Sequence, residues 1–243
     1  MIHDLQTNDR RSGILLVAFV ALQIVYLTVN VGVIAPPAPD APIEELRTTV
    51  VDHADTIRWH TLLALASFFC LFLPGIVGLR ERLPHHPSRD ILGVSVVLIL
   101  ASVVLMVTSL GVLGLVPPQD LSDSLLRGIF MFDAYSAWVV GNVITAIFLT
   151  AASTALLCDD TGPRWLGRAG LLAATAGILG SLWIVNGDVH GALFGLAVLS
   201  RALWLGWVAA AGIWLIRTAA PVRHSDEKRD RAAAAALGSV LEG

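Results

Sequence analysis

Six long apolar segments dominate the sequence and leave few folds open to it. They cover 13–35, 59–79, 91–116, 134–157, 165–185 and 191–216. A helix needs roughly 20 mainly apolar residues to cross about 30 Å of hydrocarbon, and each segment reaches that length. Only 14% of the residues are charged, whereas an ordinary soluble domain has about 25%. We therefore predict an all-α polytopic membrane protein, with one six-helix domain over 1–220 and a charged cytoplasmic tail over 221–243.

The basic residues predict the orientation, because short cytoplasmic loops are enriched in Lys and Arg. With both termini inside, the cytoplasmic side holds Arg10, Arg11, Arg80, Arg82, Arg89, Arg164, Arg168, Arg217, Arg223, Lys228, Arg229 and Arg231. The outer side then holds only Arg47, Arg58 and Arg127. The excess of arginine over lysine, with much Ala, Val, Leu and Gly, indicates a bacterial source, so we expect a location in the bacterial inner membrane.

Three tryptophans near the outer ends of the spans, Trp59, Trp138 and Trp183, are expected to form an interfacial belt. Two outer loops have the pattern of short amphipathic helices. The apolar positions of the first are Ile43, Leu46, Val50, Ala54 and Ile57, and those of the second are Leu121, Leu125, Ile129 and Phe132. We expect both helices to lie on the membrane surface as lids over the outer face.

Arg201 is the most informative polar residue, because it lies about ten residues, or roughly 15 Å, into the last span. An arginine near the bilayer centre costs at least about 2.5–3.5 kcal/mol, so a partner or a hydrated cavity must compensate. Helical spacing puts His190, Phe194 and Ala197 on the same face. A purely structural role, with Arg201 bound to carbonyls or to Asp133 or Asp188, is the alternative.

Other polar residues fall in the same outer half of the membrane. Gln23, Tyr26 and Asn30 share one face of the first span, His60 begins the second, and Asn142 lies within the fourth. We interpret the set as an outward-facing cavity floored by Arg201, Gln23 and Asn142, with Tyr26, Asn30 and His60 as further ligand contacts. Taken singly, Gln23 and Asn142 are equally well explained as hydrogen bonds between helices.

Asp133, Asp188 and His190 are the candidate catalytic residues, because a carboxyl group or an imidazole at the cavity mouth is able to exchange protons. No nucleophile motif, phosphate-binding loop or dinucleotide fingerprint occurs. The His and Asp spacings fit no established metal site, and His60 and His190 lie too near the membrane edge to favour haem ligation. We expect no cofactor, no metal and, without a basic surface, no nucleic-acid partner.

Three functional hypotheses follow. The first is a protein that binds a small anionic or amphipathic ligand at Arg201. The second is an integral membrane enzyme, of the cyclase or isomerase type, acting on a lipid or isoprenoid. The third is an accessory subunit that recognises a membrane protein partner or a second copy of itself through small-residue helix faces.

The cytoplasmic turn Gly-Pro-Arg-Trp-Leu-Gly at 162–167, followed by Gly170, Leu171 and Leu172, resembles that of an uncharacterised bacterial six-helix membrane family, domain of unknown function 4386. The resemblance extends over about 10–217 as a pattern, with Arg58 before the second helix and Asp133 opening the fourth. It implies a six-helix membrane protein and supplies no activity.

Overall fold

The computed structural model describes residues 2–34, 41–83, 87–158, 162–186 and 191–219, and these ranges contain helices joined by short turns and no strands. The first half contains α1 (Ile2–Val29), η1 (Asn30–Ile34), α2 (Ile43–Ala66), η2 (Ser67–Phe72), α3 (Leu73–Arg82) and α4 (Pro87–Leu115). The second half contains η3 (Pro118–Asp120), α5 (Asp123–Tyr135), η4 (Ser136–Val140), α6 (Gly141–Cys158), α7 (Arg164–Ser181), α8 (Trp183–Asn186) and α9 (Ala192–Thr218). Within them, η1, η2 and η4 are π-helical and η3 is a 3-10 turn.

Six continuous helical stretches are long and apolar enough to cross a membrane. They are Asp9–Ile34, Ile43–Arg82, Pro87–Leu115, Asp123–Cys158, Arg164–Val185 and Ala192–Thr218. The predicted six-helix membrane bundle is therefore confirmed, and the chain is a multi-pass membrane protein. The predicted tail 221–243 lies outside the described residues.

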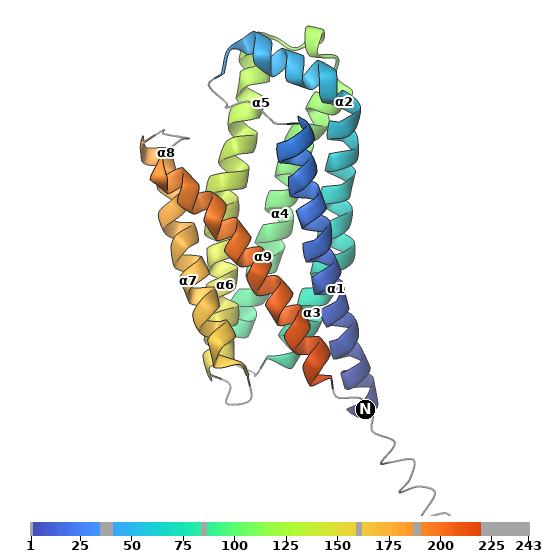
Figure 1. Ribbon diagram of the computed structural model, residues 1–243, viewed down its shortest axis with the longest axis vertical. Helices are drawn as coiled ribbons and strands as arrows, with labels where there is room; N and C mark the ends of the chain where they lie inside the picture. The colour runs from blue at the N-terminus through green and yellow to red at the C-terminus, as the bar shows by residue number, and fades with distance from the viewer. Residues whose placement is uncertain (1, 35–40, 84–86, 159–161, 187–190, 220–243) are drawn as a thin grey trace, which may run out of the picture.

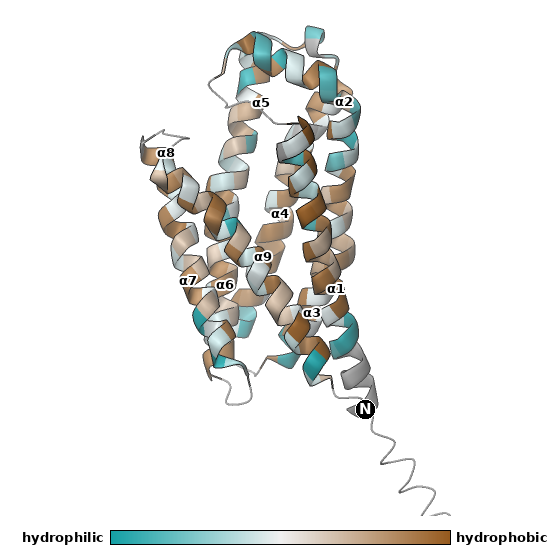
Figure 2. Ribbon diagram, in the orientation of Figure 1, coloured by the Kyte–Doolittle hydropathy of each residue, from teal (hydrophilic) through white to brown (hydrophobic). Residues whose placement is uncertain are grey.

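Figure 1 shows the bundle with its long axis vertical, and we name its two ends after that view. The upper end carries the start of α2 and α5, and the lower end carries the end of α3 and of α9. Hydrophilic residues gather at both ends, and hydrophobic residues dominate the middle of the helices (Figure 2). This banding is what a bilayer requires of the helix surfaces.

Helix α9 crosses the bundle obliquely, from α7 and α8 at the upper end to α1 at the lower end (Figure 1). Glycines permit both close contacts. A Cβ built on Gly13 of α1 would lie 2.5 Å from the Gly212 carbonyl oxygen of α9, and one built on Gly180 of α7 would lie 2.5 Å from the Ala197 nitrogen. Helices α1 and α9 therefore touch near their lower ends and diverge toward the upper end.

The lower half is filled by an apolar core with Trp204 at its centre. The Trp204 ring stacks on Phe68, with centroids 6.3 Å apart, and meets Phe19 and Phe72 edge-on at 5.8 Å. Trp204 is 1% exposed, and Phe19 and Phe72 are fully buried. These rings belong to one apolar core cluster, which also includes Leu16, Phe148 and Leu215.

The first turns of α2 fold over the upper end and pack on α5, which forms a cap. Its core contains Leu46, Val50, Leu113, Leu121 and Leu126. Arg47 of α2 donates a hydrogen bond to Asp123 of α5 at 2.7 Å, which joins the two helices. The first predicted amphipathic helix is thus the start of α2, which covers the bundle end and continues without a break into the second span.

In the second predicted amphipathic helix, the buried face was misassigned. Leu126, absent from the predicted stripe, is fully buried, whereas Leu125 and Phe132 are 51% and 45% exposed. The expected stripe assumed a helix lying flat on the membrane. Instead α5 continues through η4 into α6, so only the side that faces α2 is covered.

Candidate ligand-binding cavity

A cavity of about 590 Å³ lies inside the upper half of the bundle. Its roof is formed by the cap residues Thr49, Ile57 and Phe130, and its floor by Phe68 and Trp204. The volume is in the range of pockets that hold small molecules. The cap covers the end at which an open mouth was expected.

Six of the predicted site residues line this one cavity: Gln23, Tyr26, Asn30, His60, Asp133 and Arg201. They come from α1, η1, α2, α5 and α9, helices far apart in the sequence. The remaining wall is mainly apolar and includes Leu27, Ile34, Met106, Phe194 and Leu205. The cavity therefore combines a polar group of residues with an apolar lining.

All three π-helical segments of the described chain border the cavity. Asn30 and Ile34 belong to η1, Phe68 to η2, and Ala137 to η4. A π-helical turn breaks the i to i−4 hydrogen-bond register and frequently occurs at functional sites. In η2 a cause is visible in the sequence, because Pro74 just after it has no backbone N–H to donate.

The π-helical turn of η4 creates a binding site for Arg201. The Gly141 N–H donates to the Ser136 carbonyl instead of to the Ala137 carbonyl that an α-helix would use. The freed Ala137 carbonyl accepts a hydrogen bond from Arg201 Nη2 at 2.7 Å. Gly141 leaves the space for this contact, because a Cβ there would lie 2.9 Å from Nη2.

Arg201 also stacks on Trp204, with its guanidinium carbon 5.6 Å from the ring centroid. A guanidinium group has five N–H donors, and the Ala137 carbonyl uses only one of its nitrogens. The side chain borders the cavity, so its other donors are available to a ligand. The bond to the Ala137 carbonyl agrees with the alternative in which Arg201 binds backbone carbonyls. Among the described residues it occupies only one of the three guanidinium nitrogens.

Tyr26 and His60 form a stacked pair in the cavity wall, with ring centroids 3.6 Å apart. His60 Nε2 lies 3.0 Å from the Tyr26 carbonyl oxygen, which only accepts, so this nitrogen donates. Beside this pair, Gln23 Nε2 donates to Ser67 Oγ at 2.7 Å. These contacts connect α1 to α2 and η2, so His60 and Gln23 have structural partners as well as a place at the cavity.

Three buried polar atoms of the cavity lining have no hydrogen-bond partner in the described part of the chain. They are Asp133 Oδ1, Trp183 Nε1 and Trp204 Nε1. Nearly all buried polar groups in folded proteins are paired, so an unpaired one needs an explanation. All three atoms belong to residues that line the cavity.

Asn142 does not line the cavity, although it was expected in its floor. Its side chain is 2% exposed and donates to the Ala197 carbonyl of α9 at 3.3 Å, which joins α6 to α9. Two of the candidate catalytic residues, Asp188 and His190, lie outside the described residues. Asp133 is the candidate that the structure places at the cavity.

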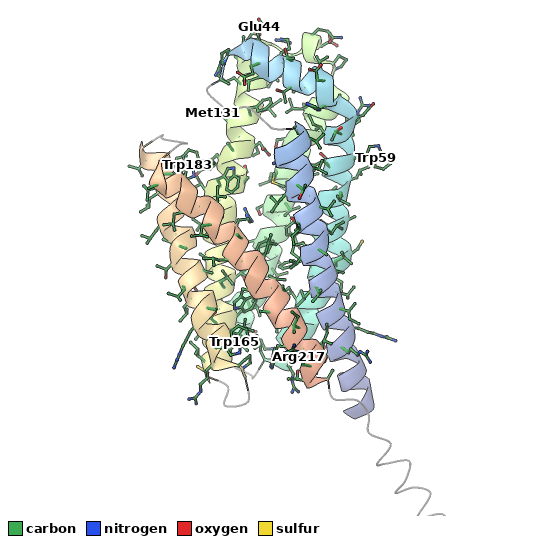
Figure 3. The ribbon with its side chains drawn as sticks, viewed as in Figure 1. Glu44, Trp59, Met131, Trp165, Trp183 and Arg217 are labelled. Carbon is green, nitrogen blue, oxygen red and sulfur yellow. The ribbon has the colours of Figure 1, made fainter. Side chains whose placement is uncertain are left out.

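The expected tryptophan belt holds for Trp59, which is 73% exposed and points away from the bundle (Figure 3). It is wrong for Trp183, which is 6% exposed, and Trp138 also lines the cavity. Sequence reasoning missed both of these and Trp204 as cavity residues. Tryptophan near the end of an apolar run looks the same whether it faces lipid or a cavity.

In the described ranges, no group of three His, Cys, Asp or Glu side chains is arranged to hold a metal ion. Comparison of the chain with protein-family models, curated proteins and solved structures gives no match. The cavity itself is therefore the basis of the functional argument.

Proposed function

We propose that the protein binds a small amphipathic ligand in this cavity and that Arg201 neutralises the ligand's acidic group. The observation that carries the proposal is the guanidinium group, which borders the cavity and is held at one nitrogen by the Ala137 carbonyl, its one hydrogen bond among the described residues. A buried arginine without an anion is costly within a membrane. A carboxylate or phosphate would remove that cost through charge-assisted hydrogen bonds.

The indole groups of Trp204 and Trp183 supply two further donors for the same acidic group or its neighbours. The apolar wall, including Leu27, Met106 and Phe194, suits a hydrocarbon portion of the ligand. Both requirements are met by one amphipathic molecule, whereas a simple inorganic anion would leave the apolar wall without a partner.

The membrane is the proposed source of the ligand. The cap covers the upper end, and the aromatic core of Trp204, Phe19 and Phe72 fills the lower half. Helices α1 and α9 diverge toward the upper end, and their diverging parts supply Leu27 and Phe194 to the cavity wall. We propose that the ligand enters from the membrane between these two helices.

We further propose that the upper end faces the outside of a bacterial inner membrane, with both termini in the cytoplasm. The lower end carries Arg80, Arg82, Arg164 and Arg217, whereas Arg47, Arg58 and Arg127 are the basic residues of the cap region. This distribution supports the orientation through the positive-inside rule. The ligand would then come from the outer leaflet of that membrane.

Native mass spectrometry with lipid extraction tests the proposal. Wild type, Arg201→Gln and Arg217→Gln are purified gently from native membranes and compared. Arg217 is a matched control because it is an exposed arginine at the lower end of the same helix (Figure 3). We expect one defined species on wild type and on Arg217→Gln, and its loss from Arg201→Gln. The same bound species on all three folded proteins would refute the proposal.

The enzyme hypothesis has one observation in its favour, which is Asp133 at the cavity. A proton donor acting on a bound lipid would need this carboxyl group. If incubation with the extracted ligand leaves its mass and double-bond positions unchanged in wild type, catalysis on that ligand is excluded and the binding function stands.

A further inference from the structure

Asp133 is the one lining group that the proposed ligand's acidic end cannot satisfy. Its Oδ1 is buried without a hydrogen-bond partner among the described residues, and a carboxylate only accepts hydrogen bonds. An anionic ligand at Arg201 would place a second negative charge near this one. Like charges brought together in a low-dielectric site repel strongly.

Asp133 and the Arg201 site lie on the same wall of the cavity. Asp133 precedes Ala137 by four residues, and the Ala137 carbonyl is the group that holds Arg201. Both attachment points therefore lie on the same short stretch of chain, across the start of η4. One short ligand is able to reach both groups.

The two charges do not neutralise each other. Arg201 binds the Ala137 carbonyl and stacks on Trp204, and it forms no ion pair with Asp133 within the described ranges. Tyr26, which also lines the cavity, lies within electrostatic reach of both groups. The remaining titratable side chain of the lining is His60, which stacks on the Tyr26 ring and donates a hydrogen bond to the Tyr26 carbonyl.

We infer that the ligand is a zwitterion with a primary ammonium group, which binds at Asp133 while its acidic group binds at Arg201. The inference rests on the proposed function and adds the class of ligand. An ammonium group supplies the N–H donors that Asp133 lacks, and a net-neutral ligand matches a cavity that holds one carboxylate and one guanidinium. Phosphoethanolamine carries both groups, a primary ammonium and a phosphate, and it occurs either as a phospholipid headgroup or as the free compound.

The test measures lipid selectivity by native mass spectrometry on delipidated wild type, Asp133→Asn and Arg201→Gln. The probes are phosphatidylethanolamine, phosphatidylglycerol, which lacks the cation, and phosphatidylcholine, whose trimethylammonium group cannot donate a hydrogen bond. We expect wild type to prefer phosphatidylethanolamine about tenfold over both others, as a lost charge-assisted hydrogen bond implies. Asp133→Asn should lose this preference and still bind phosphatidylglycerol.

Two variants keep the result interpretable. Asp120→Asn removes an exposed carboxylate at the same end of the molecule and should keep the wild-type preference. Asp133→Glu retains the charge and should keep the direction of the preference, which guards against a folding defect in Asp133→Asn. Free phosphoethanolamine is added as a competitor. If free phosphoethanolamine displaces the lipid, the headgroup alone is the ligand. If it does not, the ligand is the intact lipid. Either result supports the inference when replacing Asp133 with Asn abolishes the binding preference.

An unchanged lipid preference in Asp133→Asn, with all lipids weakened in Arg201→Gln, would overturn the zwitterion inference and leave the proposed function intact. If Arg201→Gln binds every lipid as wild type does, the proposed function fails and the inference fails with it.

Discussion

The Arg201 guanidinium group donates a hydrogen bond to the Ala137 carbonyl at 2.7 Å because η4 has released that carbonyl from its own helix. The partly buried Arg201 cation of α9 is thus anchored by a carbonyl of η4, the π-helical turn between α5 and α6. The anchor fixes the position of the charge while using little of its hydrogen-bonding capacity. This is the arrangement expected of a preorganised binding group, and the predictions below test its parts.

Gly141→Ala should displace Arg201 from its anchor. The added Cβ would lie 2.9 Å from Arg201 Nη2 and 3.2 Å from the Ser136 carbonyl oxygen. Because Nη2 is the far end of a flexible side chain, the guanidinium group should shift, so we expect weaker ligand retention with little loss in the free energy of unfolding. Gly206→Ala on α9 is the control, because its Cβ would have no neighbour within 4 Å. Native mass spectrometry checks both variants, and equal ligand retention by the two would show that Gly141 is not needed.

The Gln23–Ser67 hydrogen bond should couple α1 to η2. A double-mutant cycle with Gln23→Leu and Ser67→Ala is expected to give a coupling of about 0.6 kcal/mol, and at most about 1.7 kcal/mol, as in other membrane helix pairs. The measurement is the free energy of unfolding of the four proteins. Ser95→Ala replaces Ser67→Ala in a control cycle, because Ser95 bonds to Leu92 of its own helix. Strict additivity for Gln23 and Ser67 would contradict the pairing.

Trp204 should have two separable roles. Trp204→Ala removes the centre of the aromatic core and is expected to destabilise the fold by about 3–5 kcal/mol. Trp204→Phe keeps an aromatic ring and removes the unpaired N–H, so it should unfold close to wild type and retain less ligand. Unfolding and native mass spectrometry on both variants separate the roles. Full ligand retention by Trp204→Phe would show that the indole N–H does not bind the ligand.

The orientation is testable by cysteine labelling. The two native cysteines, Cys70 and Cys158, are first replaced by Ala. Single cysteines are then placed at Glu44 on the upper end and Arg217 on the lower end (Figure 3). A membrane-impermeant maleimide applied to intact spheroplasts should label the Glu44→Cys protein alone. Labelling of the Arg217→Cys protein instead would reverse the topology and place the cap in the cytoplasm.

The spans were predictable because their length and apolarity are set by the bilayer, independently of how the helices pack. The lining face of α1 was also predictable. Gln23, Tyr26 and Asn30 recur at helical spacing, and all three reach the cavity. Arg201 was found by its depth in an apolar run, where a charge needs a reason, and Asp133 by its place at the start of the fourth predicted span.

Depth alone does not say which side of a helix a residue occupies, and this is why Asn142 was misplaced. Asn142 lies nine residues after Asp133, which is two and a half turns of an ideal α-helix and puts the two side chains on opposite faces. The π-helical segment η4 lies between them and changes this relation further. The π-helical segment η4 has no comparable signal in the sequence, because no proline lies within it or just after it. The Ala137 anchor for Arg201 was therefore visible only in the structure.

Photo-crosslinking inside the living cell tests the central claim most directly. A benzophenone amino acid is placed at Phe194, which lines the cavity, or at Leu199, which is 51% exposed on the same helix. The account predicts that Phe194 captures one discrete mass that disappears in the Arg201→Gln background, whereas Leu199 captures mixed bulk lipid in both backgrounds. The same lipid mixture at both positions, or a discrete Phe194 adduct that persists without Arg201, would contradict it.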